Sequence, residues 1–150
     1  MRKLLPLFLC LCSMFLLVGC ACSQKAYSEK RTLDYSIIIG SGGGFTGMYQ
    51  GKYVDTSGVV YSWEGTSFNN SKRTSIKKLE QEQISQLNNY LEKNTPEKIA
   101  YNQSGNLTNF IVLKGKDKEI SISWIYKFPK DDTPQEIINL NNYITNTINK

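Results

Sequence analysis

Histidine is absent from the 150-residue sequence, and cysteine occurs only at positions 10, 12, 20 and 22. Catalytic sets that pair serine or cysteine with histidine are therefore excluded, and so are histidine-based zinc sites. Because no cysteine follows Cys22, the folded part of the chain has no internal disulfide bond and no cysteine-based metal site. Carboxylates are left as the side chains for acid–base chemistry, and we expect no cofactor and no bound metal.

The sequence also lacks a hydrophobic run long enough for a membrane-spanning helix. The apolar segment Leu4–Val18 has about 15 residues, whereas a helix that crosses a bilayer needs about 20. Arg2 and Lys3 precede this segment, and a short positive start followed by an apolar run is typical of a signal peptide. Removing these two cations lowers the formal net charge from +5 to +3. The other lysines form no dense basic run, so nucleic acid is not expected as a partner.

The end of the apolar segment, Leu17-Val18-Gly19-Cys20, resembles the lipobox of bacterial lipoproteins. The resemblance implies cleavage before Cys20, attachment of a diacylglyceryl group to its thiol and acylation of the new amino terminus, for example by palmitate. Two or more acyl chains anchor a protein stably to a membrane, which one chain does not. We therefore expect a signal peptide over residues 1–19, a lipidated tether over 20–32, and a domain outside the cytoplasm, held at the cell membrane or the outer membrane. The alternative is an ordinary secretory signal in which Cys20 has no special role.

Residues 33–150 have the size of one domain. Short runs with alternating apolar and polar residues, rich in β-branched and aromatic side chains, predict strands within it. Turn residues separate several of these runs, as in Asp55-Thr56-Ser57-Gly58 and Gly115-Lys116-Asp117. The predicted strands are 33–39, 46–54, 59–63, 107–113 and 119–125, and the polar segment 65–75 is predicted to be an exposed loop.

Two segments have the spacing of amphipathic helices. In residues 81–94 the apolar side chains fall on one helical face. The second helix is predicted to follow Thr133 as its N-cap, with Pro134 in the first helical position and Glu136 as the capping-box partner. The resulting order, three strands, a helix, two strands and a helix, predicts an α+β domain. Its sheet is expected to be mainly antiparallel with about five strands, and both helices are expected to pack on one face.

A glycine-rich segment, Gly40 to Gly47, follows the first predicted strand. A phosphate-binding loop would lead into a helix N-terminus, but here a strand is predicted to follow. A hairpin that needs positive φ angles and close backbone approach explains the glycines. Phe45 would then be a large apolar side chain at a loop tip, which is typical of a surface that binds a partner. The candidate partner-binding loop comprises Gly42, Gly43, Gly44, Phe45, Thr46 and Gly47.

Few carboxylates stand where catalysis would be suggested. Asp131 and Asp132 are adjacent before a predicted helix, where they favour its positive N-terminus. Glu64, beside Trp63 at a strand end, is the other candidate. We expect Trp63 and Trp124 to be buried in the sheet, the alternative being carbohydrate binding by their rings.

Several short motifs together are similar to those of a group of small bacterial lipoproteins without an assigned activity. These motifs are Gly42-Gly43-Gly44-Phe45-Thr46-Gly47, Trp63-Glu64-Gly65, Gly105-Asn106-Leu107-Thr108-Asn109-Phe110-Ile111 and Trp124. The motif Gly43–Gly47 in a first hairpin, followed by strands, a helix, another hairpin and a closing helix, also resembles emfourin, a small bacterial inhibitor of thermolysin-like metalloproteases. The missing nucleophile–base sets and the glycine loop that presents Phe45 favour a non-enzymatic binding module of the cell envelope. The resemblance to emfourin implies that its protein partner is a protease, which it would inhibit. The alternative is an envelope hydrolase that acts on a glycan or peptide through Glu64 or through Asp131 and Asp132.

Overall fold

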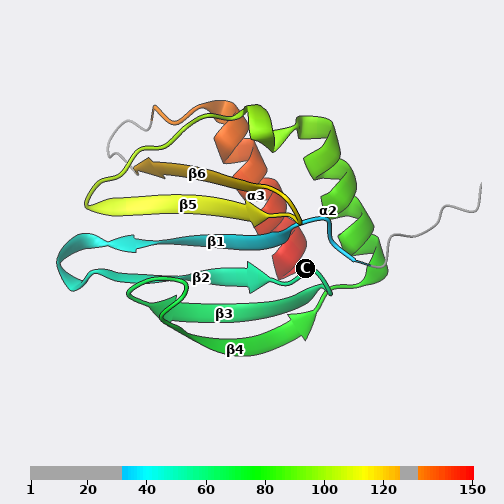
Figure 1. Cartoon of the computed structure of the whole chain (residues 1–150), viewed down its shortest axis with the longest axis horizontal. Coiled ribbons are helices and arrows are strands. Elements are labelled where there is room, and N and C mark those ends of the chain that lie inside the picture. Colours follow the sequence, from blue (N-terminus) through cyan, green and yellow to red (C-terminus); the bar gives the residue numbers. More distant parts are fainter. Residues whose placement is uncertain (1–31, 126–131) are drawn as a thin grey trace, which may run out of the picture.

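The computed structural model describes residues 32–125 and 132–150, and they form an α+β domain with one antiparallel sheet (Figure 1). The six strands lie in the order β4-β3-β2-β1-β5-β6. The signal peptide, Cys20, nearly all of the tether and Asp131 lie outside the described residues. The strands are β1 (Ser36–Gly43), β2 (Met48–Val54), β3 (Val59–Gly65), β4 (Ser71–Lys78), β5 (Leu107–Lys114) and β6 (Glu119–Ile125). The helices are η1 (Gly44–Thr46), α2 (Gln81–Asn94), η2 (Pro96–Lys98) and α3 (Gln135–Asn149).

The predicted α+β class and antiparallel sheet are confirmed, but the prediction of about five strands is wrong by one. Strand β4 begins at Ser71, within the segment 65–75 that was predicted to be an exposed loop, and continues to Lys78. Its sequence, Ser-Lys-Arg-Thr-Ser-Ile-Lys-Lys, has no apolar alternation because most of its residues are exposed. What makes it a strand is its antiparallel pairing with β3, from Gly65 opposite Ser71 to Val59 opposite Lys78. Backbone pairing of this kind leaves no hydrophobic signal in the sequence.

The start of α3 also differs from the prediction. The N-cap is Pro134, not Thr133, so the helix begins at Gln135 and the predicted capping box is not formed. Pro134 has φ −53° and ψ 136°, which places it outside the helix. Its carbonyl oxygen accepts hydrogen bonds from the backbone N–H groups of Ile137 and Ile138 at 3.0 and 3.3 Å. The first turn is thus held by the backbone, and Thr133 is buried beside it.

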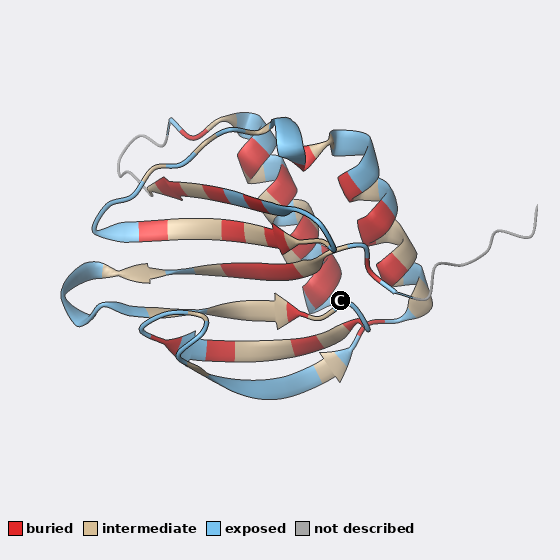
Figure 2. Ribbon diagram, viewed as in Figure 1, coloured by how far each residue is buried: buried red, intermediate tan, exposed pale blue. Residues whose placement is uncertain are grey.

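The hydrophobic core lies between one face of the sheet and the two long helices (Figure 2). On the sheet, Ile37 pairs with Val54 on one side and Leu113 on the other, and all three are fully buried. The helices contribute stripes at helical spacing, which confirms both predicted amphipathic patterns. These stripes are Ile84, Leu87 and Leu91 from α2, and Ile137, Leu140, Ile144 and Ile148 from α3.

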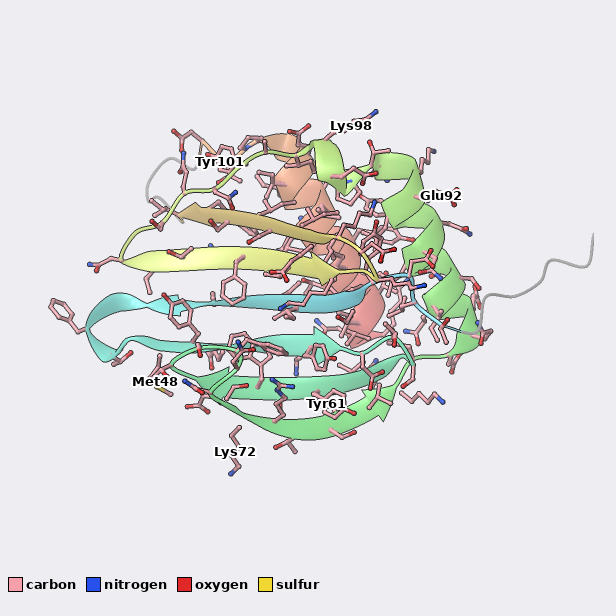
Figure 3. All side chains as sticks on the ribbon, viewed as in Figure 1. Met48, Tyr61, Lys72, Glu92, Lys98 and Tyr101 are labelled. Carbon is pink, nitrogen blue, oxygen red and sulfur yellow. The ribbon has the colours of Figure 1, made fainter. Side chains whose placement is uncertain are left out.

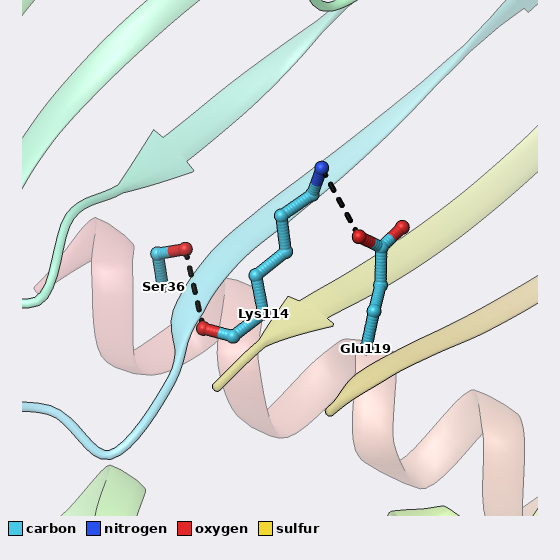
Figure 4. Close-up of polar contacts among 3 residues, drawn as sticks. All are labelled: Ser36, Lys114 and Glu119. Atoms are coloured by element: carbon cyan, nitrogen blue, oxygen red, sulfur yellow. Dashed lines mark hydrogen bonds and ion pairs between the residues drawn. The ribbon is translucent and has the colours of Figure 1, made fainter. Parts of the chain in front are cut away.

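Side-chain contacts join β1 to β5, and β5 to β6, at the N-terminal end of β1 (Figure 4). The Ser36 hydroxyl donates a hydrogen bond to the Lys114 carbonyl oxygen at 3.4 Å, and Lys114 Nζ lies 3.2 Å from a carboxylate oxygen of Glu119. Both members of this ion pair are about half exposed, so it contributes at most about 1 kcal/mol. From this end β1 runs in the centre of the sheet to the glycine-rich hairpin at the opposite end.

Candidate binding surface at the β1–β2 hairpin

Glycine determines the shape of the hairpin that joins β1 to β2. Gly43, Gly44 and Gly47 have φ angles of 108°, 67° and 61°, a region that residues with a side chain rarely adopt. Between them, Thr46 closes the turn: its hydroxyl donates to the Gly43 carbonyl oxygen at 3.4 Å and accepts from the Met48 N–H at 3.2 Å. The predicted hairpin with positive φ angles is therefore confirmed, and β1 continues through Gly43, four residues beyond the predicted strand end.

A further glycine, Gly40, allows aromatic rings to lie directly on the sheet. Gly40 pairs with Gly51 on β2, and both belong to the face of the sheet that turns away from the helices. A Cβ atom on Gly40 would lie 2.8 Å from atoms of both the Trp63 and the Phe110 ring. The rings therefore occupy the space that a side chain would take, and Trp63 is only 2% exposed as a result. Close backbone approach, expected from the glycines, is observed at the same residue, because the Cβ atom would lie 2.7 Å from the Gln50 carbonyl oxygen.

Three exposed apolar side chains gather at the hairpin, and we call them the tip patch: Phe45, Met48 and Leu107. Phe45 lies in the turn itself and is fully exposed, while Leu107 is 59% and Met48 38% exposed. Met48 and Leu107 lie on either side of Gly43, which pairs with Met48 on β2 and with Leu107 on β5. Met48, Gly43 and Leu107 therefore form one row across β2, β1 and β5. Figure 3 labels Met48 beside the hairpin.

Sequence reasoning placed Phe45 at the loop tip but did not find Met48 or Leu107 as its neighbours. Each occupies the first position of its strand, β2 or β5, where an apolar residue is ordinarily taken as part of the core. Only the register across Gly43 shows that both lie beyond the last buried row of the sheet. The loop residue Thr46 has a structural role in the turn, through the hydrogen bonds given above.

A polar groove adjoins the tip patch on the helix side of the sheet. Its volume is about 610 Å³, and a second hollow of about 520 Å³ beneath the hairpin shares Ser41, Gln50, Glu64 and Asn109 with it. In residues 32–125 and 132–150, Lys52, Glu64 and Lys72 have no ion pair or side-chain hydrogen bond. The polar side chains that line the groove are Ser41, Gln50, Lys52, Ser62, Glu64, Lys72, Thr74, Asn109 and Asn141.

Glu64 is the candidate catalytic residue that the structure places in this groove, where it is exposed. A hydrolytic mechanism with paired carboxylates needs a second acid about 5–9.5 Å from the first. Among the described residues that line the groove, Glu64 is the only carboxylate. Asp132 is exposed and does not line the groove, and Asp131 lies outside the described residues. Of the proposed carboxylates that the structure describes, Glu64 and Asp132, only Glu64 lines the groove.

Both tryptophans are buried, as expected, on opposite faces of the sheet. Trp124 belongs to the hydrophobic core under the helices. Trp63 lies on the other face, where its ring meets Phe68 edge-on with 5.5 Å between the ring centroids. Neither indole ring is exposed enough to stack on a sugar.

Polar contacts position the N-terminal end of the domain at the opposite end of the sheet from the hairpin. The amide of Asn88, on α2, accepts a hydrogen bond from the Asp34 N–H at 3.0 Å and donates one to the Thr32 carbonyl oxygen at 2.9 Å. The Leu33 N–H donates to the Thr56 carbonyl oxygen at 2.8 Å, in the turn between β2 and β3. Asn88 and Leu33 are buried, so the point at which the chain enters the domain is well defined.

The turn at this end is organised by the carboxylate of Asp55. One carboxylate oxygen accepts hydrogen bonds from the backbone N–H groups of Ser57 and Val59 and from the Ser57 hydroxyl, at 2.6 to 3.0 Å. Partial burial raises the pKa of Asp55, but these hydrogen bonds and one from Tyr61 outweigh it and hold the pKa below its ordinary value. Burial, together with the nearby Asp55 charge, raises the pKa of Tyr61.

No family model, curated protein or solved structure matches the chain. The similarities to small bacterial lipoproteins and to emfourin thus stay predictions that depend on the short motifs. In the described ranges, no helix is both long and apolar enough to cross a membrane.

Proposed function

We propose that this protein is a lipid-anchored lipoprotein of the cell envelope whose domain binds a protein partner through the tip patch. The observation that carries the proposal is a fully exposed Phe45 on a turn whose conformation is fixed by glycines, with exposed Met48 and Leu107 beside it. Exposed apolar groups that cluster in this way are typical of interaction sites, whereas single exposed apolar residues are common.

The direction in which the tip patch points favours a protein over the anchoring membrane. With the lipid on Cys20, the tether enters the domain where Asn88 binds the segment Thr32–Asp34. Strand β1 has eight residues, so it spans about 26 Å between that end and the hairpin. The tip patch is therefore at the end of the domain farthest from its attachment, where it is accessible to a partner.

The size of the patch fits a modest but specific contact. Burying a phenylalanine, leucine or methionine side chain completely is worth about 1.5–3 kcal/mol each, before the cost of association is subtracted. Because Phe45 is fully exposed while Met48 and Leu107 are already partly covered, Phe45 has the most surface to lose on binding. We therefore expect Phe45 to contribute more than either neighbour to the affinity.

The finer proposal is that the partner is a thermolysin-like metalloprotease and that binding inhibits it. It is supported by the resemblance of Gly43–Gly47 to the emfourin motif and by the fixed geometry of the hairpin. A loop that blocks a protease must keep its shape in the cleft, and the hydrogen bonds of Thr46 within the turn serve that end.

The experiment is to titrate thermolysin with the soluble chain that starts after Cys20 and to follow cleavage of a small fluorogenic peptide. We expect inhibition that Phe45→Ala weakens by tenfold or more while leaving the thermal unfolding midpoint unchanged. The control is Lys116→Ala, in the exposed turn between β5 and β6, and it should inhibit like the original protein. Absence of inhibition by the original protein would refute the inhibitor proposal. Equal inhibition by Phe45→Ala would refute the role of the tip patch.

A further inference from the structure

The two edges of the sheet differ in whether another segment of the described chain covers them. At β6, the segment Tyr101–Gln103 runs along the edge: Asn102 forms a parallel bridge with Ser123. The Gln103 N–H donates to the Ser123 carbonyl oxygen at 2.9 Å, and the Ser123 N–H donates to the Tyr101 carbonyl oxygen at 3.0 Å. At β4, by contrast, no segment in residues 32–125 and 132–150 pairs with the outer edge. An open edge offers backbone donors and acceptors to another chain.

The open edge is strongly positive. Strand β4 carries Lys72, Arg73, Lys77 and Lys78 in eight residues, and no acidic residue. Lys72 and Thr74 pair across β3 with Glu64 and Ser62 and line the polar groove, whereas Arg73 pairs with Trp63 on the other face. Figure 3 shows Lys72 projecting from the β4 edge of the sheet. Two cations from different strands, Lys52 and Lys72, thus reach the same groove without an ion-pair partner in the described chain.

The part of this edge that is regular enough to pair with another strand is Ser71–Ser75. The register between β3 and β4 shifts after Val60, so that Ile76 is an extra residue and the strand is irregular beyond Ser75. Within the regular part, Arg73 is held in place: its guanidinium lies 4.0 Å from the centroid of the Phe68 ring and donates to the Phe68 carbonyl oxygen at 3.0 Å. A cation fixed in this way loses little freedom when an anion binds to it.

We propose that β4 is a docking edge for an extended, acidic peptide segment of a partner protein, which pairs with Ser71–Ser75 as a seventh strand. Alternate side chains of the added strand face the groove, where carboxylates meet Lys72, and the remainder face Arg73. Lys52, on β2, adds positive charge to the same groove without being adjacent to the added strand. A second copy of this chain does not fit, because pairing two β4 edges would place eight cations together. This surface is distinct from the tip patch, and the inference does not depend on what the tip patch binds.

The probe is a fluorescein-labelled ten-residue peptide of alternating Glu and Thr, added to the soluble chain at low salt. Binding is measured by fluorescence anisotropy, and the amide exchange of β4 is measured by NMR. We expect saturable binding, slower exchange of alternate amides in Ser71–Ser75, and at least a tenfold loss of affinity in Lys72→Glu. The matched control is Lys116→Glu, which makes the same charge change at an exposed turn on the other half of the sheet and should alter the affinity less than twofold. Thermal unfolding of both variants shows that they are folded.

Three results of these measurements would overturn the proposal. The first is no saturable binding of the peptide, and the second is equal loss of affinity in Lys72→Glu and Lys116→Glu. The third is binding that leaves the exchange of every amide in Ser71–Ser75 unchanged, since attraction between charges alone would give that pattern. A peptide methylated on every backbone nitrogen distinguishes strand pairing from attraction between charges alone. It keeps the carboxylates but has no backbone N–H group to donate to the edge. We expect it to bind at least tenfold more weakly, and equal binding would refute strand addition.

Discussion

Replacing Gly40 by alanine tests why the central strand carries glycine next to its aromatic neighbours. The new Cβ would lie 2.7 Å from the Gln50 carbonyl oxygen and 2.8 Å from both the Trp63 and Phe110 rings. The carbonyl is part of the backbone and the rings are packed, so none of the three can move away at little cost. Overpacking of this kind costs about 1–3 kcal/mol. Alanine also lowers the conformational entropy of the unfolded chain, which raises the free energy of unfolding by about 0.4–1 kcal/mol.

All three contacts are shorter than 3.0 Å, so the overpacking cost lies in the upper half of its range. The net expectation is a loss of about 1–2.5 kcal/mol in the free energy of unfolding, or a fall of about 4–10 °C in the unfolding midpoint. Urea titration followed by tryptophan fluorescence measures it, and near-ultraviolet circular dichroism reports the displaced Trp63 ring. Ser41→Ala is the control, because Ser41 is the next residue of β1 and is exposed; it should change stability by less than about 0.5 kcal/mol. A Gly40→Ala protein as stable as the original would refute the argument that the rings occupy the glycine's space.

Asn88→Ala should lower stability by about 1–3 kcal/mol and speed amide exchange at Asp34, because it removes both hydrogen bonds that fix the N-terminal segment; unchanged exchange at Asp34 would contradict this. The hydrogen bonds that lower the pKa of Asp55 stabilise the fold fully above the unfolded value of 3.8, and this contribution is lost as the pH falls through the lower folded pKa. Asp55→Asn should therefore show a weaker loss of stability at acid pH than the original protein in urea titrations from pH 6 to pH 2. Cys20→Ser should abolish labelling by a fatty-acid analogue and leave residues 1–19 attached, as seen by mass spectrometry; labelling that persists would refute the anchor. A panel of glycans and peptides should show no turnover, and turnover that is lost in Glu64→Gln would instead establish the hydrolase alternative.

The sequence predicted those parts of the fold in which side chains carry a periodic signal. Helix α2 was predicted at its observed bounds because its apolar residues recur on one face. Strand β4 was missed because its residues face solvent and only backbone pairing with β3 defines it. The N-cap of α3 was placed one residue early, since the pattern Thr-Pro-x-Glu does not show whether Pro134 already has helical angles.

Only one residue of the tip patch could be predicted from the sequence, for a similar reason. Glycines and an apolar residue at a turn are a local signal, so Phe45 could be placed at the tip. Leu107 and Met48 join it through the register of three strands, which a single sequence does not encode in any local pattern. Likewise, Lys52 and Lys72 are separated by 20 positions in the sequence and share one groove only because β2, β3 and β4 are adjacent.

Photo-crosslinking in living cells tests the central claim most directly. The full-length protein would carry a benzophenone amino acid at position 45 or, as the control, at position 116 at the opposite end of the sheet. We predict a discrete protein adduct from position 45, absent from position 116 and reduced when Leu107 is also changed to serine. No adduct from position 45, or the same adducts from both positions, would contradict a binding module that acts through the tip patch.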